Sequence, residues 1–227
     1  MKRAIRSLNK HRSAQLEGVA HAFLAEIALW HGEEKTALTE CNRARDLATY
    51  HKYEVDFIRV GRLQGIAALR SSNGDFTIAS AHLNDALTRV RSCQAVDEEL
   101  ATLIALAELH WRIGGADHLD EARRFLDDVW RRADDGPYPL FHADALNILA
   151  SIERAEGNLD KAREAGTEAY KKAWLQGPPF AYEYGLRNGE HHLNDLGVPL
   201  PQLPPYDDSL YEPMPDVEII PAPPESD

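Results

Sequence analysis

Residues 66–86 read IAALRSSNGDFTIASAHLNDA, and this stretch decides the fold. Ala67 is followed seven positions later by Gly74, Ala79 comes five positions after the glycine, and Ala86 seven after that. Small residues at helical spacing let neighbouring helices approach closely, and glycine ends a helix at little cost because it has no side chain. The stretch therefore predicts two helices joined by a short turn at Gly74.

The same pattern recurs on both sides of this stretch at a nearly constant interval. The small residue of the first helix returns at Ala25, Ala107 and Ala150, so that successive units begin 42, 40 and 43 residues apart. The other turn glycines and second-helix positions are Gly32, Ala37, Ala44, Gly114, Ala122, Val129, Gly157, Ala162 and Ala169. A period in this range is typical of stacked helical repeats, in which each hairpin buries its apolar face only against its neighbours.

These residues resemble the tetratricopeptide repeat. That family has a large-small pair in the first helix, a glycine at the turn, an apolar residue two positions later, and two alanines seven apart. The best matches are Ile66-Ala67, Gly74, Phe76, Ala79 and Ala86, and Leu149-Ala150, Gly157, Leu159, Ala162 and Ala169. The unit at Leu24-Ala25 has Glu34 at the apolar turn position, and the unit at Gly114 has a longer turn and Val129 for the last alanine. The units also lack the usual final proline and exceed the common repeat of about 34 residues.

The resemblance covers roughly residues 13–197 and implies an all-α, right-handed superhelical solenoid of antiparallel helix pairs, with about four repeats. One further first helix, which would cap the stack and end at Gly197, is predicted from Tyr182, Leu186, Leu193 and Leu196. Residues 1–12 are interpreted as a partial helix of a truncated preceding repeat. This interpretation predicts that the chain is part of a larger polypeptide or docks end-on to another protein.

Residues 198–227 form a Pro-rich acidic tail, with nine of the thirteen prolines, seven acidic residues and no Lys, Arg or His. Such a segment is extended and forms no core of its own. It nevertheless carries apolar residues at Leu203, Tyr206, Leu210, Tyr211, Met214, Val217, Ile219 and Ile220. Two interpretations stay open: a disordered tail, or a strap from Tyr206 to Ile220 that returns along the repeats or docks on a partner. Ordered strapping is preferred for the part nearest Gly197.

Nothing in the sequence predicts an enzyme, a cofactor or a metal site, since phosphate-loop, nucleophile-elbow and zinc-helix motifs are all missing. His191 and Asp195 share a helix face and are interpreted as a local surface pair, and the adjacent His191 and His192 point too far apart to be joint metal ligands. The net charge of −12 opposes non-specific nucleic-acid binding. Basic residues that alternate with acidic ones predict a salt-bridged face: Arg123, Arg124, Arg131, Arg132, Lys161, Arg163, Lys171 and Lys172.

The sequence also predicts the cellular compartment of the protein. No apolar run approaches the ~20 residues that span a bilayer, and the N-terminus has no secretory apolar core. Two cysteines are too few for a disulfide framework, and Cys41 is predicted to be a buried thiol. We therefore expect a cytoplasmic protein without a membrane partner.

The resemblance also implies where a partner binds, because first helices of this family line a concave groove. The groove residues carried over from the family are Glu26, Leu29, Trp30, Gln64, Ser71, Glu108, Trp111, Arg112, Asp144, Asn147, Ser151 and Arg154. Trp30 and Trp111 are the residues most suggestive of binding hot spots, although interhelix packing next to the turn is the preferred interpretation of each. Chaperone-binding members clamp a C-terminal carboxylate with Lys and Asn, but Ala22, Glu26 and Gly65 occupy those positions here, so that partner class is not expected.

Three functions remain as alternatives. The first is a non-enzymatic scaffold or adaptor that binds a protein or peptide through the concave groove or the end of the solenoid. The second rests on repeats of about 40 residues, the Tyr-x-Tyr-Gly-Leu stretch at residues 182–186 and the acidic tail, which resemble C-terminal sensor segments of bacterial signalling ATPases in defence or transcriptional regulation. The third is a receptor for a small peptide or metabolite. An enclosed cavity favours the receptor, and an open trough favours the adaptor.

Overall fold

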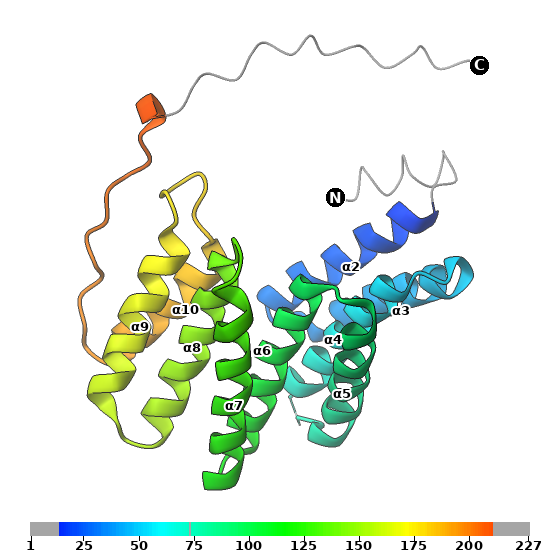
Figure 1. Cartoon of the computed structure of the whole chain (residues 1–227), viewed down its shortest axis with the longest axis horizontal. Helices are drawn as coiled ribbons and strands as arrows, with labels where there is room; N and C mark the ends of the chain where they lie inside the picture. Colours follow the sequence, from blue (N-terminus) through cyan, green and yellow to red (C-terminus); the bar gives the residue numbers. More distant parts are fainter. Residues whose placement is uncertain (1–13, 73, 211–227) are drawn as a thin grey trace.

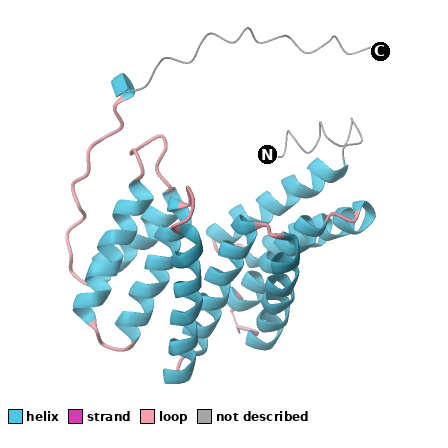
Figure 2. Cartoon of the chain, viewed as in Figure 1, coloured by secondary structure: helices cyan, strands magenta, loops and turns pink. Residues whose placement is uncertain are grey.

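The structure, a computed structural model, describes residues 14–72 and 74–210 (Figure 1). Within these ranges the chain is all-helical, with nine α-helices, one short 3-10 helix and no strand (Figure 2). The helices are α2 (Ala14–Trp30), α3 (Glu34–His51), α4 (Glu54–Arg70), α5 (Phe76–Cys93), α6 (Val96–Ile113), α7 (Ala116–Ala133), α8 (Pro139–Ala155), α9 (Leu159–Trp174), α10 (Glu183–Asp195) and η1 (Asp208–Leu210). The predicted all-α class is confirmed.

Consecutive helices pack as pairs, and the pairs pack on one another in chain order. The closest packing joins α2 to α3, α4 to α5, α6 to α7 and α8 to α9, and α10 packs against both α8 and α9. Each even-numbered helix also contacts the next even-numbered helix, from α2 through α4, α6 and α8 to α10. We call these five helices the inner row. The odd-numbered helices of the described part make no comparable contacts with one another.

The repeated small residues lie where the sequence predicts the helices to meet. Twelve repeat positions, four first-helix alanines and eight second-helix positions, are each at most 1 % exposed: Ala25, Ala37, Ala44, Ala67, Ala79, Ala86, Ala107, Ala122, Val129, Ala150, Ala162 and Ala169. The predicted turn glycines, Gly32, Gly74, Gly114, Gly157 and Gly197, all have positive φ. This left-handed conformation is one that residues with a Cβ rarely adopt, which explains why glycine stands at each turn. Cys41 is fully buried as expected, and burial raises the pKa of its thiol to about 12.

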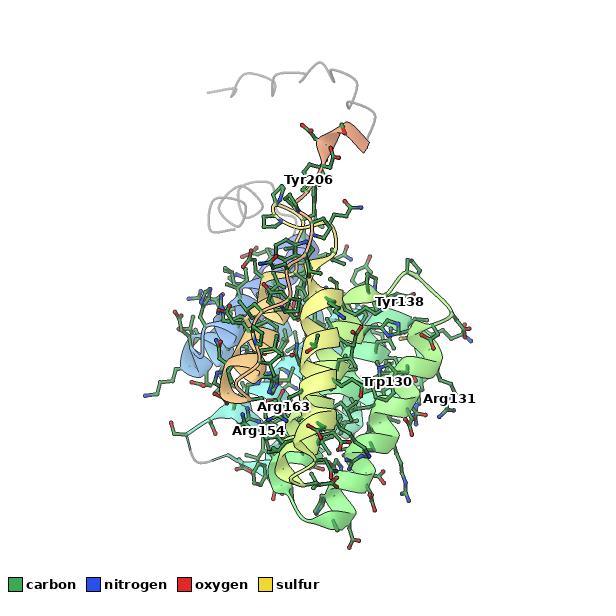
Figure 3. All side chains as sticks on the ribbon, turned by 90° about the vertical axis from the view of Figure 1, so that its left-hand side faces the viewer. Trp130, Arg131, Tyr138, Arg154, Arg163 and Tyr206 are labelled. Carbon is green, nitrogen blue, oxygen red and sulfur yellow. The ribbon has the colours of Figure 1, made fainter. Side chains whose placement is uncertain are left out.

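The described part of the tail returns along the last helices, as the strapping interpretation expects for the residues nearest Gly197. The indole Nε1 of Trp174 donates a hydrogen bond to the carbonyl oxygen of Pro204 over 2.8 Å. The rings of Phe180 and Tyr206 meet edge to face, with centroids 4.9 Å apart. Figure 3 shows Tyr206 beyond the end of the last helices, away from the helix faces that carry Arg154 and Arg163. The remaining strap residues, Tyr211 to Ile220, and the interpreted partial repeat at residues 1–12 lie outside the described residues.

The basic side chains of the second helices are largely paired with acidic ones, which confirms the predicted salt-bridged face. Arg123 bonds to Glu153 and Glu156 of the next hairpin, with contacts of 2.7 Å to each. Arg131 pairs with Asp128 and points away from the helices in Figure 3. Further pairs join Arg124 to Glu121, Arg132 to Glu99, Arg163 to Asp160 and Lys171 to Glu168.

Candidate functional site

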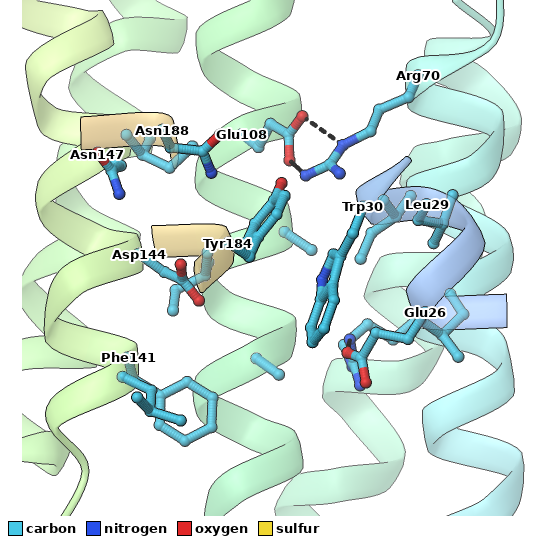
Figure 4. A pocket seen from close by; sticks show the side chains of 18 of the residues that line it. Glu26, Leu29, Trp30, Arg70, Glu108, Phe141, Asp144, Asn147, Tyr184 and Asn188 are labelled. Carbon is cyan, nitrogen blue, oxygen red and sulfur yellow. Dashed lines mark hydrogen bonds and ion pairs between the residues drawn. The ribbon is translucent and has the colours of Figure 1, made fainter. Parts of the chain in front are cut away.

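A cavity of about 310 Å³ lies against the inner row and takes its lining from all five helices (Figure 4). It is lined by Glu26, Leu29, Trp30, Arg62, Leu63, Ile66, Arg70, Ala101, Ile104, Ala105, Glu108, Leu140, Phe141, Asp144, Asn147, Ile148, Tyr182, Tyr184 and Asn188. The first three belong to α2, and the last three come from the start of α10 and the residue before it. The cavity therefore depends on side chains from both ends of the inner row.

Aromatic side chains close this cavity where the two ends of the inner row meet. Trp30, the last residue of α2, stacks on Tyr184 of α10 with centroids 5.5 Å apart and ring planes 17° from parallel. Tyr182 meets the same indole edge to face at 6.4 Å. Arg187 donates a hydrogen bond to the carbonyl oxygen of Trp30 over 3.4 Å. We call Trp30, Tyr182 and Tyr184 the aromatic bridge, because they span from the first described helix to the last.

Two arginines in the lining are held by buried carboxylates. Arg70 donates to both oxygens of Glu108 over 2.9 and 2.6 Å, and Arg112 donates to the same carboxylate over 2.9 Å. Burial alone would raise the pKa of Glu108, but these two guanidinium groups hold it below its ordinary value. Arg62, which is buried, pairs with Glu98 over 3.2 Å and with Glu26 over 3.4 Å. Both arginines therefore form ion pairs with carboxylates of the protein itself.

Asp144 and Asn147 of α8 differ from these pairs because each keeps an acceptor atom without a partner. One oxygen of Asp144 accepts a hydrogen bond from the hydroxyl of Tyr182 over 3.0 Å. The amide of Asn147, which is buried, donates to the carbonyl oxygen of Gly185 over 3.2 Å. The Oδ1 atom of each residue, which in Asn147 is the only side-chain oxygen, is shut off from solvent and meets no donor within the described part of the chain. A buried acceptor without a donor is unfavourable, so these two atoms are candidates for contact with a ligand.

The carboxyl group of Asp144 also has an unusual acidity. Burial raises its pKa to about 7 from an ordinary 3.8, although the Tyr182 hydrogen bond and the charge of Arg70 act in the opposite direction. The carboxylates of Glu26 and Glu108 add to the rise. The group therefore changes charge close to neutral pH, where an ordinary aspartate is fully ionised.

This acidity predicts a pH-dependent gain in stability for Asp144→Asn. Between pH 3.8 and about 7 the folded protein retains a proton on Asp144 that the unfolded chain has lost, so the wild-type free energy of unfolding falls as pH rises through this window. The asparagine variant has no carboxyl group to ionise here, so its free energy of unfolding does not fall for this reason. Its side-chain oxygen still accepts the hydrogen bond from Tyr182. Thermal unfolding should give matching pH trends near pH 4 and a higher melting temperature for the variant at pH 8, by about 2–4 °C for each kcal/mol gained.

The exposed carboxylate of Asp160 provides the control for this comparison, because Asp160→Asn also removes one negative charge from a helix. A pH-independent difference between wild type and Asp144→Asn, or the same trend in both variants, would contradict the raised pKa of Asp144.

The structure brings six of the twelve predicted groove residues together in the cavity. These six are Glu26, Leu29, Trp30, Glu108, Asp144 and Asn147. The other six lie outside its lining: Gln64, Ser71, Trp111, Arg112, Ser151 and Arg154.

Two physical reasons explain why these six residues lie outside the cavity lining. Ser71, Trp111, Arg112 and Arg154 lie at the C-terminal ends of first helices and have contacts of their own: Trp111 packs on the core, Arg112 pairs with Glu108, and Arg154 pairs with Asp195. Gln64 and Ser151 lie between helices instead. The amide of Gln64 donates to Asn42 of α3 over 3.2 Å, and the hydroxyl of Ser151 donates to the carbonyl oxygen of Asn147 over 3.1 Å.

Sequence reasoning missed the partners of these side chains, chiefly Arg62, Arg70, Phe141, Tyr182 and Tyr184. The sequence does contain a signal for some of these partners. The pairs Arg62 with Glu98, Arg70 with Glu108 and Asp144 with Tyr182 are 36, 38 and 38 positions apart, close to one repeat. Residues at these separations lie within about one helical turn of equivalent positions on neighbouring first helices, so complementary polar side chains can meet across the stack.

Within the described ranges, no group of three or more His, Cys, Asp or Glu side chains is arranged to hold a metal ion. The helices of that same part are all too short or too polar to cross a membrane. Comparisons of this chain with protein-family models, with curated proteins and with solved structures found no match.

Proposed function

We propose that this chain is a non-enzymatic receptor that holds a small molecule, or one side chain of a peptide, in the cavity of a tetratricopeptide-like solenoid. The observation that carries the proposal is the aromatic bridge, because it joins the two ends of the inner row beside a partly open cavity. Small-ligand sites occupy about 300–1,000 Å³, with mostly apolar walls and a few polar groups. A volume of about 310 Å³ with aromatic walls and two unpartnered acceptors fits this description.

The composition of the lining supports binding rather than catalysis. The cavity's lining residues include no Ser, Thr, Cys, His or Lys, and two of its three carboxylates, Glu26 and Glu108, are paired with arginines. Its arginines are paired with Glu26, Glu98 and Glu108, so they serve to hold neighbouring helices in register.

The resemblance to sensor segments of signalling ATPases is compatible with this proposal. The Tyr-x-Tyr-Gly-Leu stretch that carries that resemblance supplies Tyr182 and Tyr184 to the aromatic bridge. In a longer signalling protein, such a cavity would serve as the sensory part, since a ligand that contacts both α2 and α10 would favour the closed arrangement of the repeats.

An adaptor function remains a second proposal, and a different surface supports it. Apolar side chains are exposed on α2 and around the start of α4, two helices that pack on each other: Leu16, Phe23, Ile27, Tyr53 and Val55. Where such side chains form one patch, they are typical of protein contacts. A protein partner at this N-terminal surface would leave the cavity free, so the two proposals are compatible.

The receptor proposal predicts that filling the cavity abolishes small-molecule binding. Ala101 lies in the middle of α6 and lines the cavity, so a phenylalanine at this position would occupy the space of a ligand. Ala81→Phe introduces the same ring at an exposed position in the middle of α5 and serves as the matched control. Saturation-transfer NMR with a library of neutral, cationic and anionic fragments should find ligands whose affinity falls at least tenfold in Ala101→Phe alone.

Circular dichroism of both variants checks that the helices are retained. Fragments that bind Ala101→Phe as well as wild type, or a library without any ligand, would overturn the receptor proposal and leave the adaptor.

A further inference from the structure

The two acceptors of α8 define what a ligand of this cavity must offer. Asp144 and Asn147 are three positions apart on one helix, so their side chains lie on the same face, and both line the cavity. Their Oδ1 atoms are shut off from solvent and meet no donor in the described residues. Asn147 is only 4 % exposed. A bound group with at least two hydrogens to donate would satisfy both atoms at once.

Three protein donors near these oxygens are already engaged with other acceptors. The hydroxyl of Tyr182 donates to the other oxygen of Asp144, and the amide of Asn147 donates to Gly185. Arg70 is bound to Glu108. The donors for the two free oxygens are therefore expected from outside the chain.

The charges of the lining residues narrow the choice of ligand further. Glu26 and Glu108, the other carboxylates of the lining, each form an ion pair with an arginine. Asp144 forms no ion pair with any cation of the described part, so its negative charge, when it is ionised, is offset only in part by the charge of Arg70. A cation beside Asp144 would restore the balance in a site where the low local polarity strengthens the attraction.

Aromatic side chains surround the same space. Figure 4 shows the carboxylate of Asp144, the ring of Tyr184 and the ring of Phe141 bordering one opening, with the indole of Trp30 beside Tyr184. Aromatic faces attract ammonium groups and also bury the hydrocarbon chain attached to them. The cavity thus combines one free carboxylate and one free amide oxygen with aromatic walls.

We propose that the cavity binds a primary ammonium group on an apolar stem, with the ammonium donating to Oδ1 of Asp144 and of Asn147. An ammonium group carries three hydrogens in a compact arrangement, enough for both acceptors. This inference rests on the proposed receptor function and names its ligand class. A free amine and the side chain of a lysine in a peptide share this chemistry.

Isothermal titration calorimetry at pH 8 tests the inference with four probes. They are phenethylamine, its neutral isostere 2-phenylethanol, the anion 3-phenylpropanoate, and an acetylated, amidated tripeptide with a central lysine. Phenethylamine is expected to bind at least tenfold more tightly than the alcohol and the propanoate. Tighter binding of the tripeptide than of phenethylamine would identify a peptide lysine as the source, and the reverse order a free amine; either order supports the inference.

Two outcomes with these probes separate this inference from the receptor proposal. Equal or tighter binding of the alcohol or the propanoate, abolished by Ala101→Phe, would overturn the ammonium assignment and leave the receptor intact. Failure of both amines to bind would also overturn the ammonium assignment. The receptor proposal would then be tested separately, by whether neutral or anionic fragments of the library bind in the cavity.

Removal of one charge tests the role assigned to Asp144. Asp144→Asn keeps the shape of the side chain and its acceptor for Tyr182, so we expect at least a tenfold loss of affinity for phenethylamine. The same change at Asp195, which pairs with Arg154 outside the cavity, serves as the control and should leave the affinity unchanged. An unaltered affinity in Asp144→Asn would show that the ammonium does not bind there.

Discussion

Replacement of Glu98 by alanine is expected to lower the free energy of unfolding by about 3–5 kcal/mol. The carboxylate of Glu98 is buried in α6 and accepts hydrogen bonds from Arg59 over 2.6 Å and from Arg62 over 3.2 Å. Arg62 is itself buried in α4. Without Glu98 its guanidinium keeps only the 3.4 Å contact with Glu26, and a buried charge with so little compensation strongly destabilises the folded state.

An exposed ion pair supplies the control for this prediction. Glu54 pairs with Arg89 over 2.8 Å, and both side chains are more than 40 % exposed. Glu54→Ala should therefore cost less than about 1 kcal/mol. Urea unfolding followed by circular dichroism measures both losses. Similar small losses in the two variants would contradict the assignment of Glu98 as a buried link between neighbouring hairpins.

Enlarging the small residues at the helix contacts should also destabilise the fold. Ala67 of α4 and Ala150 of α8 are both fully buried, so Ala67→Leu and Ala150→Leu are each expected to lower the free energy of unfolding by about 1–3 kcal/mol through overpacking. Ala81→Leu, at an exposed position of α5, is the control. Unchanged thermal unfolding in both buried variants would contradict the close approach of the paired helices.

The helices could be predicted from the sequence because each contact between them requires a particular type of residue at a particular position. An alanine such as Ala67 is needed wherever two helices approach closely, and a glycine such as Gly74 wherever the turn takes a left-handed conformation. Both requirements recur with each repeat, so a single sequence shows them several times. The register of the hairpins and the position of the turns follow from these residues alone.

The cavity could be predicted only in part, for a physical reason. Repeat positions indicate which side chains leave the packing face, and this logic found Glu26, Asp144 and Asn147. It could not show that Trp30 meets Tyr184, because that contact depends on how far the whole stack curves. Curvature is the sum of small rotations between hairpins, and no single repeat encodes it.

The aromatic bridge also has a consequence for the order of folding. Nearly all contacts in the described chain join helices that are neighbours or next neighbours in sequence, and such local contacts form quickly because little chain entropy is lost in closing them. The bond from Arg187 to the backbone of Trp30 instead closes a loop of 157 residues. We expect this closure to form last, after every intervening hairpin is in place. A ribosome-bound chain that has not yet released α10 would therefore be helical and stable but unable to retain a ligand, so that binding appears only when synthesis has passed the last helix.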